Sequence, residues 1–203
     1  MTEAERPVID AAKLPSITFG YHGTTWWATA AFMVIEGTTL IVLLVSYVYL
    51  RRNFVEWPPP PTALPDLLVP TINLALLLFT IVPMALARRA AHSLDLHGVR
   101  VFLVSAVLLA AVTVVLRGFE FAALNVRWDS DAYGSSLWML LGLHTTLLVI
   151  DLLESGAIAA LMFSKGREPK HFVDVEEAAV YQWFLSISYV PVYVLIFLGP
   201  RLL

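Results

Sequence analysis

Five long apolar stretches make up most of this chain, and they restrict its fold more than any other feature. A helix needs about 20 predominantly apolar residues to cross the hydrocarbon layer of a membrane. Each stretch is predicted to be helical, because an open strand would leave its backbone groups without partners in lipid. The fold class is therefore an all-α integral membrane protein. The predicted bundle of five transmembrane helices covers approximately residues 26–50, 67–87, 101–124, 137–163 and 180–198.

The composition supports a membrane class and excludes several others. Of the 203 residues, 59% are hydrophobic and 14% are charged, whereas soluble domains have about 25% charged residues. The net charge of −3 suggests no nucleic-acid partner, and the absence of cysteine excludes disulfides and thiolate metal sites. Two regions are expected, a polar N-terminal segment at 1–25 and a five-helix membrane domain at 26–203. Because the polar segment lacks a signal-peptide pattern, we expect the first membrane helix to direct insertion.

Basic residues are distributed unevenly between the two ends of the predicted spans. With five spans, the N-terminus, the second loop and the fourth loop share one side. Eight basic residues lie there and at most five on the other side. The eight are Arg6, Lys13, Arg88, Arg89, Arg100, Lys165, Arg167 and Lys170. The positive-inside rule therefore predicts a cytoplasmic N-terminus and a C-terminus outside.

Prolines predict irregular backbone at three places. The run Pro58–Pro61 cannot continue a helix and predicts a stiff connection after the first span. Pro83 and Pro191 lie within spans, where each removes a helical hydrogen bond. We expect a kink at both, with neighbouring helices shielding the freed carbonyl groups.

A carboxyl group interrupts the first span. Glu36 lies near its middle, where an ionised side chain costs about 2.5–3.5 kcal/mol on insertion scales. Two interpretations are open. The residue is either a proton-titrating or partner-facing carboxyl, or a protonated acid bonded to a neighbouring helix or a lipid headgroup.

Further polar side chains lie in the third and fourth spans. Arg117 and Glu120 are three residues apart and can meet on one helix face, where we expect a partly solvated ion pair near the outer end. His144, Asp151 and Glu154 follow offsets of seven and three, which predicts one polar stripe. Because His144 and Asp151 lie about 10 Å apart along the axis, one metal ion cannot reach both. The stripe is interpreted as a seam facing another helix or subunit, and no pattern supports a proton relay or an active site.

Short motifs follow one another in order along the spans. They are Val34-Ile35-Glu36, Trp57-Pro58-Pro59, Pro70-Thr71-Ile72-Asn73-Leu74, Ala91-His92-Ser93, Glu120, Tyr133-Gly134-Ser135, Leu143-His144, and Glu177-Ala178-Ala179 with Trp183. In this order and spacing the chain resembles subunit III of haem–copper oxidases, in the five-helix form of bo-type quinol oxidases and many bacterial cytochrome c oxidases. It departs from the family pattern at Ile35, Leu147, Asp151, Phe184 and Ile187.

The resemblance implies a cofactor-free accessory subunit of a bacterial inner-membrane complex. Haem and copper are expected in the partner subunits I and II, beside which this chain would pack, and phospholipid in a V-shaped cleft between its helices. Its implied role is to stabilise subunit I and to support proton uptake. Glu36 would be the cleft carboxyl, and Glu120 and His144 would be contacts between helices. Asp151 and Glu154 are expected near lipid or protons, and Trp57 and Trp183 are expected toward lipid or a partner.

Other functions remain open at this point. The chain is alternatively the accessory subunit of a nitric oxide reductase, which resembles subunit III, or a scaffolding protein without a transport role. A stand-alone proton-coupled transporter would use Glu36, Asp151 and Glu154. The absence of internal repeats and of a dense polar midplane argues against the transporter.

Overall fold

The computed structural model describes residues 17–166 and 168–202, and the regular secondary structure of this part is helical. Five helical segments are long and apolar enough to cross a membrane, which confirms the predicted five-span fold. Residues 1–16 of the predicted polar segment lie outside the described residues, as do Arg6, Lys13 and Arg167.

Each predicted stretch falls within one helical segment to within one residue, and the helices extend at most five residues beyond it, except at the start of the last one, which begins nine residues earlier. They are α1 (Thr24–Arg51), α2 (Leu68–Phe79) followed by α3 (Ile81–His92), α4 (Leu96–Ala123), α5 (Ala132–Phe163), and α6 (His171–Tyr193) continued by η3 (Val194–Leu198) and α7 (Gly199–Leu202). A short turn, η2 (Gly20–His22), precedes α1. The prediction that the last span begins at residue 180 was wrong, because the helix begins at His171 and includes Asp174, Glu176 and Glu177. These acids lie inside α6 and face protein neighbours or a groove.

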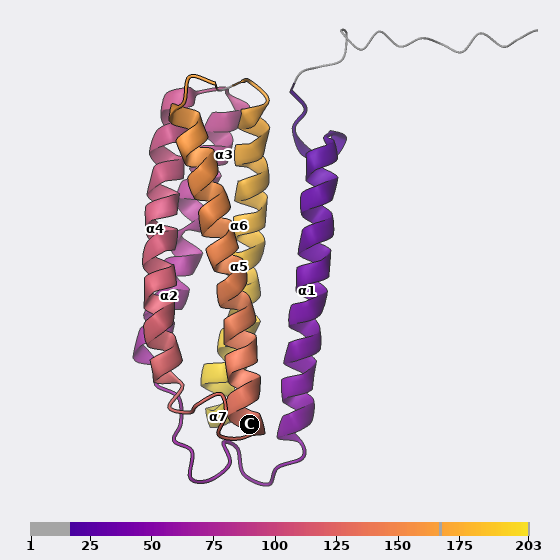
Figure 1. The fold of residues 1–203 in the computed structure, drawn as a ribbon, viewed down its shortest axis with the longest axis vertical. Coiled ribbons are helices and arrows are strands. Elements are labelled where there is room, and N and C mark those ends of the chain that lie inside the picture. Colours follow the sequence, from indigo (N-terminus) through magenta and orange to yellow (C-terminus); the bar gives the residue numbers. More distant parts are fainter. Residues whose placement is uncertain (1–16, 167, 203) are drawn as a thin grey trace, which may run out of the picture.

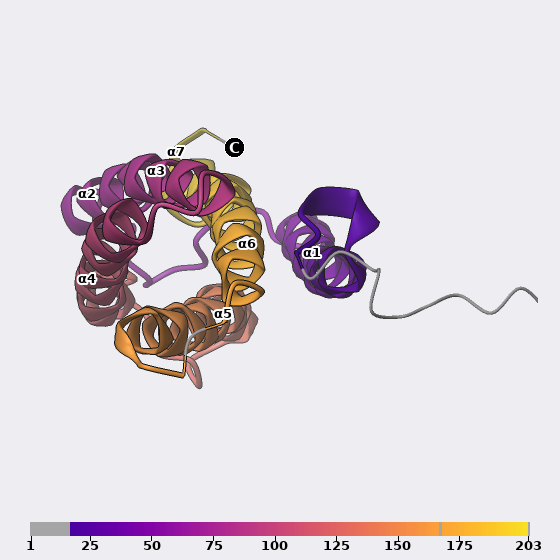
Figure 2. The ribbon, with the colours of Figure 1, turned by 90° about the horizontal axis from the view of Figure 1, so that it is seen from above.

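Four spans form a bundle, and α1 stands beside it (Figure 1). Seen from the end, α2 with α3, α4, α5 and α6 surround a common centre, and α1 lies outside this ring (Figure 2). The α1 helix packs against α5 and α6. Only 6% of its most apolar window is buried, compared with 28% to 44% for the other spans. It is therefore attached to the bundle along one side only.

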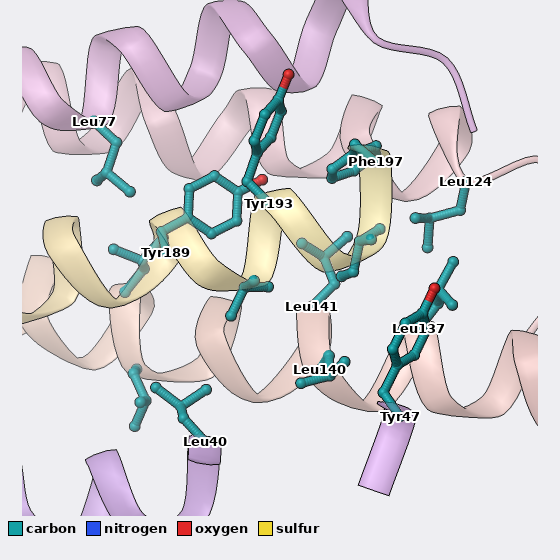
Figure 3. Close-up of a cluster of buried hydrophobic side chains, with 14 of the residues drawn as sticks. Leu40, Tyr47, Leu77, Leu124, Leu137, Leu140, Leu141, Tyr189, Tyr193 and Phe197 are labelled. Carbon is teal, nitrogen blue, oxygen red and sulfur yellow. The ribbon is translucent and has the colours of Figure 1, made fainter. Parts of the chain in front are cut away.

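Two apolar clusters hold the bundle at opposite ends. One contains large side chains, among them Leu77, Leu141, Tyr189 and Phe197 (Figure 3). The other is rich in alanine and lies between α3, α4, α5 and α6. Because lipid is as apolar as leucine, tight packing holds such helices together, and small side chains allow close approach.

Aspartates begin two of the spans. Asp95 accepts a hydrogen bond from the backbone N–H of His97 (3.1 Å) at the start of α4, and Asp131 accepts one from that of Gly134 (2.7 Å) at the start of α5. Such caps satisfy donors that a helix start leaves free. A Cβ at Gly134 would lie 2.2 Å from the carbonyl oxygen of Arg127, so this position requires glycine.

The prolines inside spans distort their helices, as predicted. The second span breaks at Thr80, three residues before Pro83, and Pro191 is followed by the π-helical segment η3. The α6 helix supplies partners at the first break. Gln182 donates to Thr80 Oγ1 (2.6 Å), and the Ser186 hydroxyl donates to the carbonyl of Leu77 (3.2 Å). At this break the carbonyl of Leu77 is thus covered by a protein donor rather than by lipid.

Candidate functional site

A groove separates α1 from the bundle. It encloses about 470 Å³ between α1, α5 and α6. Its lining consists of Thr25, Ala28, Thr29, Phe32, Glu36, Ile150, Glu154, Ile158, Asp174, Glu177 and Tyr181. The lining of α1 and α6 comes from their N-terminal halves, so the groove lies toward the end of the molecule that holds the second and fourth loops. Apolar walls and several carboxyl groups are therefore combined in one cavity.

Glu36 lies in this groove, half-buried, and is bonded to another helix. The Tyr181 hydroxyl donates to Glu36 Oε2 at 2.7 Å, which connects the middle of α1 to α6. This geometry matches the interpretation of an acid bonded to a neighbouring helix. A hydrogen bond from a phenol serves a protonated or an ionised carboxyl, so it leaves the proton-titrating interpretation open.

The predicted polar stripe of α5 is divided among different surroundings. His144 is fully buried in the bundle, Asp151 is 2% exposed beside the groove, and Glu154 is exposed and lines it. His144 and Glu154 are ten residues apart, and over this length an α-helix stops about 80° before completing three full turns. The two side chains therefore point in different directions and face different neighbours. Among the described residues, the Asp151 carboxyl has no hydrogen bond or ion pair.

Glu177 was noted in the sequence only as part of the Glu177-Ala178-Ala179 motif, and not as a candidate site residue. Its side chain is 7% exposed and lines the groove, and neither carboxylate oxygen has a hydrogen-bond partner among the described residues. Asp174 lines the same cavity. Both lie before residue 180, where the last span was predicted to begin. A clearer signal is their spacing of three residues, which places them on one face of a helix.

None of the groove carboxyls of Glu36, Glu154 and Glu177 forms an ion pair with a basic side chain in the described part of the chain. Buried charges are usually paired, and an unpaired one is costly in low dielectric. The groove therefore favours protons, or a cationic group of a bound molecule, as the partner of these acids.

A second set of polar groups lies inside the bundle, and all its main members are paired. Arg117 forms an ion pair with Glu120, and its guanidinium lies 4.1 Å above the ring centre of Tyr189. The Tyr189 hydroxyl donates to Glu120 Oε1 (2.9 Å). We call this set, completed by His144, the buried network.

His144 joins the buried network through both ring nitrogens. Nε2 lies 3.0 Å from the carbonyl oxygen of Leu185, and Nδ1 lies 3.4 Å from Arg117 Nη2. A carbonyl only accepts and a guanidinium only donates, so these contacts require the neutral imidazole with its proton on Nε2. The expected role of Glu120 and His144 as contacts between helices fits this geometry.

Two sequence-based expectations need correction. Arg117 and Glu120 are 1% and 0% exposed, so the prediction of a partly solvated ion pair was wrong. The pair faces the bundle centre, where α5 and α6 cover it. Trp57 does not face lipid or a partner, because it is 9% exposed and its indole N–H donates to the Tyr47 hydroxyl (2.8 Å). The chain after α1 folds back, and the ring packs against Tyr133 at 4.8 Å.

Trp183 is half-buried at the outer face of α6, and the guanidinium of Arg88 lies 5.4 Å from its ring centre. Its expected contact with lipid or a partner stays a prediction. Across the described residues, no group of three or more His, Cys, Asp or Glu side chains is arranged to hold a metal ion.

Five apolar spans with an internally paired polar network and an open groove define a multi-pass membrane protein. The family model described as cytochrome c oxidase subunit III matches residues 53–199, and the chain belongs to this family.

Two relatives extend the similarity beyond the matched segment. The chain is 21% identical over 198 residues to cytochrome c oxidase subunit 3 of Synechocystis sp., covering 94% of this chain and 83% of the relative. It is 22% identical over 175 residues to cytochrome c oxidase subunit 3 of Thermostichus vulcanus, covering 84% and 85%. The first match includes most of α1, which lies before the matched part of the family model.

Proposed function

We propose that this chain is the accessory, cofactor-free subunit III of a respiratory terminal oxidase. It lies in a bacterial inner membrane, with its N-terminus in the cytoplasm, and packs beside the catalytic subunit I, with subunit II in the same complex. Family membership carries the proposal. The described residues support it further, because their buried polar groups Arg117, Glu120 and His144 connect helices to one another.

The proposed role in the complex is to stabilise subunit I and to support proton uptake. The groove would lie at the cytoplasmic end under the positive-inside rule, since Arg88, Arg89, Arg100, Lys165 and Lys170 lie at the same end of the described spans. Its unpaired carboxyls, led by Glu36, are groups that can take up and release protons near the side from which protons enter.

Phospholipid is the proposed occupant of the groove. Phe32, Ile150 and Ile158 supply an apolar wall for an acyl chain. Thr25 and Asp174 supply polar contacts near the helix ends, where a headgroup would lie. The opening beside α1 faces the bilayer, so a lipid can enter without crossing protein.

Purification through a tag on this chain tests the proposal. In mild detergent we expect haem-bearing chains to co-elute, with a reduced-minus-oxidised haem spectrum and a partner that carries the six-histidine pattern of subunit I. Oxygen consumption should exceed nitric oxide reduction in the same preparation. A chain that is monodisperse alone and yields no haem, or one that conducts protons alone in liposomes, would contradict the proposal.

A further inference from the structure

A second hollow lies on the outer side of the bundle, between α3 and α6. It encloses about 320 Å³ and shares no lining residue with the groove. Its walls are Ala85, Arg88, Arg89, His92 and Trp183. Two arginines, a histidine and an indole thus line one pocket near the end of two spanning helices. We call it the basic pocket.

The charges around the basic pocket leave a positive excess. Glu176, 1% exposed, receives hydrogen bonds from Arg88 Nη2 (2.8 Å) and from the backbone N–H of Gly20 (2.9 Å), and its Oε1 lies 2.9 Å from His92 Nε2. Its single negative charge is therefore balanced by Arg88. Arg89 is exposed and forms no ion pair with any acid in the described part of the chain, so its charge is available.

A donor in the pocket wall is also unused. The Trp183 ring is held by the Arg88 guanidinium, and its Nε1–H is shielded from solvent with no acceptor among the described residues. An unsatisfied buried donor costs about 1–3 kcal/mol. An anionic oxygen that enters beside the ring would satisfy it.

An apolar stripe continues from the basic pocket toward the middle of the membrane. Val82 lies seven residues before Arg89 on α3, and Ile187 and Val190 lie four and seven residues after Trp183 on α6, which places each below its polar partner. Their exposed fractions are 50%, 60% and 36%.

We propose that the basic pocket binds the phosphate of an anionic phospholipid whose acyl chains lie along this stripe. The planar fork of Arg89 matches phosphate oxygens, and a basic pocket between membrane helices attracts such headgroups. A free phosphate would use the pocket alone, whereas the stripe below it provides a surface for acyl chains. The site is distinct from the lipid proposed for the groove.

A photoreactive lipid tests the proposal in membranes that contain the full chain with its partners. The probe is phosphatidylglycerol with a diazirine in one acyl chain, and labelled peptides are mapped by mass spectrometry. We expect labelling around Ile187 on α6 and Val82 on α3, stronger than with the matching phosphatidylcholine. Arg89→Gln should lower this labelling about fivefold, because it removes a charge-assisted contact, and Arg89→Lys should lower it less.

Arg52→Gln is the matched control, since Arg52 is an exposed arginine at the opposite end of the molecule. It should leave the labelling on α3 and α6 unchanged. Equal labelling by both lipids, or no decrease in Arg89→Gln, would overturn the proposal. An Arg89→Gln protein that loses only thermal stability would assign Arg89 to balancing the α3 dipole instead. Suppression of labelling by soluble glycerol phosphate would indicate a free-phosphate site.

Discussion

The buried network and the groove both contain glutamates, but the network pairs its glutamate with other side chains and the groove leaves its glutamates largely unpaired. In the network, Glu120 is paired with Arg117 and receives a hydrogen bond from Tyr189. In the groove, Glu177 has no hydrogen-bond partner among the described residues, and Glu36 accepts one hydrogen bond, from the phenol of Tyr181. An acid inside a membrane span is thus structural where protein satisfies it and available for exchange where it is left incomplete. The side chains around each acid therefore determine whether its role is structural or functional.

The largest expected effect comes from breaking the buried network. Arg117→Met leaves a buried carboxylate without its cation, which costs about 3–5 kcal/mol of folding free energy. We expect strongly reduced assembly of the complex and a large decrease in the free energy of unfolding measured with denaturant. Arg117→Met combined with Glu120→Gln should recover much of the loss. If the single and double variants are equally unstable, the charge is not the cause.

In the groove, by contrast, removing a carboxyl group is expected to increase the free energy of unfolding. Glu177→Leu removes an unsatisfied buried carboxyl and should stabilise the chain by about 1–3 kcal/mol in the same unfolding measurement. Turnover of the complex should fall if the acid takes part in proton uptake, a trade of activity for stability that functional sites show. A destabilised Glu177→Leu protein would mean that the carboxyl has a partner after all.

Glu36→Gln sharpens the comparison because it changes charge without changing shape. The amide oxygen can still accept the Tyr181 hydroxyl, so we expect the fold and assembly to remain intact. A gradual decline in turnover, followed over repeated cycles, would support a proton or lipid role. Tyr181→Phe is the control for the hydrogen bond, with an expected cost of about 0.5–1.5 kcal/mol. Loss of the assembled complex in Glu36→Gln would instead make the charge structural.

The smallest effect is expected for an ion pair outside the spans. Arg127 forms bidentate hydrogen bonds with Asp129 in the connection between α4 and α5, and these hold the pKa of Asp129 below its usual value. Because the pKa of Asp129 is lower in the folded protein than the 3.8 of the unfolded chain, its ionised carboxylate stabilises the fold at a pH above 3.8. This stabilisation is lost as the pH falls through the pKa of the folded protein. Because the pair is solvent-exposed, Asp129→Asn should leave the melting temperature unchanged at pH 7. A clear decrease would show that the pair orders the loop.

Hydropathy and proline chemistry were sufficient to predict the spans and their distortions, because these depend on short stretches of sequence. The start of α6 was missed, because hydropathy alone does not show that Glu176 pairs with Arg88 and can therefore lie within the helix. The hydrogen bond from Tyr181 to Glu36 joins residues far apart in the chain. No local pattern distinguishes it from a contact with lipid. The burial of Trp57 likewise depends on the path of the loop.

The α1 helix is secured near its two ends, and between them the Tyr181 hydroxyl bonds to Glu36. Near its start, the backbone N–H of Gly20 bonds to Glu176, and near its end Tyr47 accepts the Trp57 indole. A helix held in this way can bend away from the bundle in places but cannot detach from it. A guest molecule in the groove would consequently be exchanged through a sideways opening beside the N-terminal half of α1, and its residence time should depend on the stiffness of that one helix.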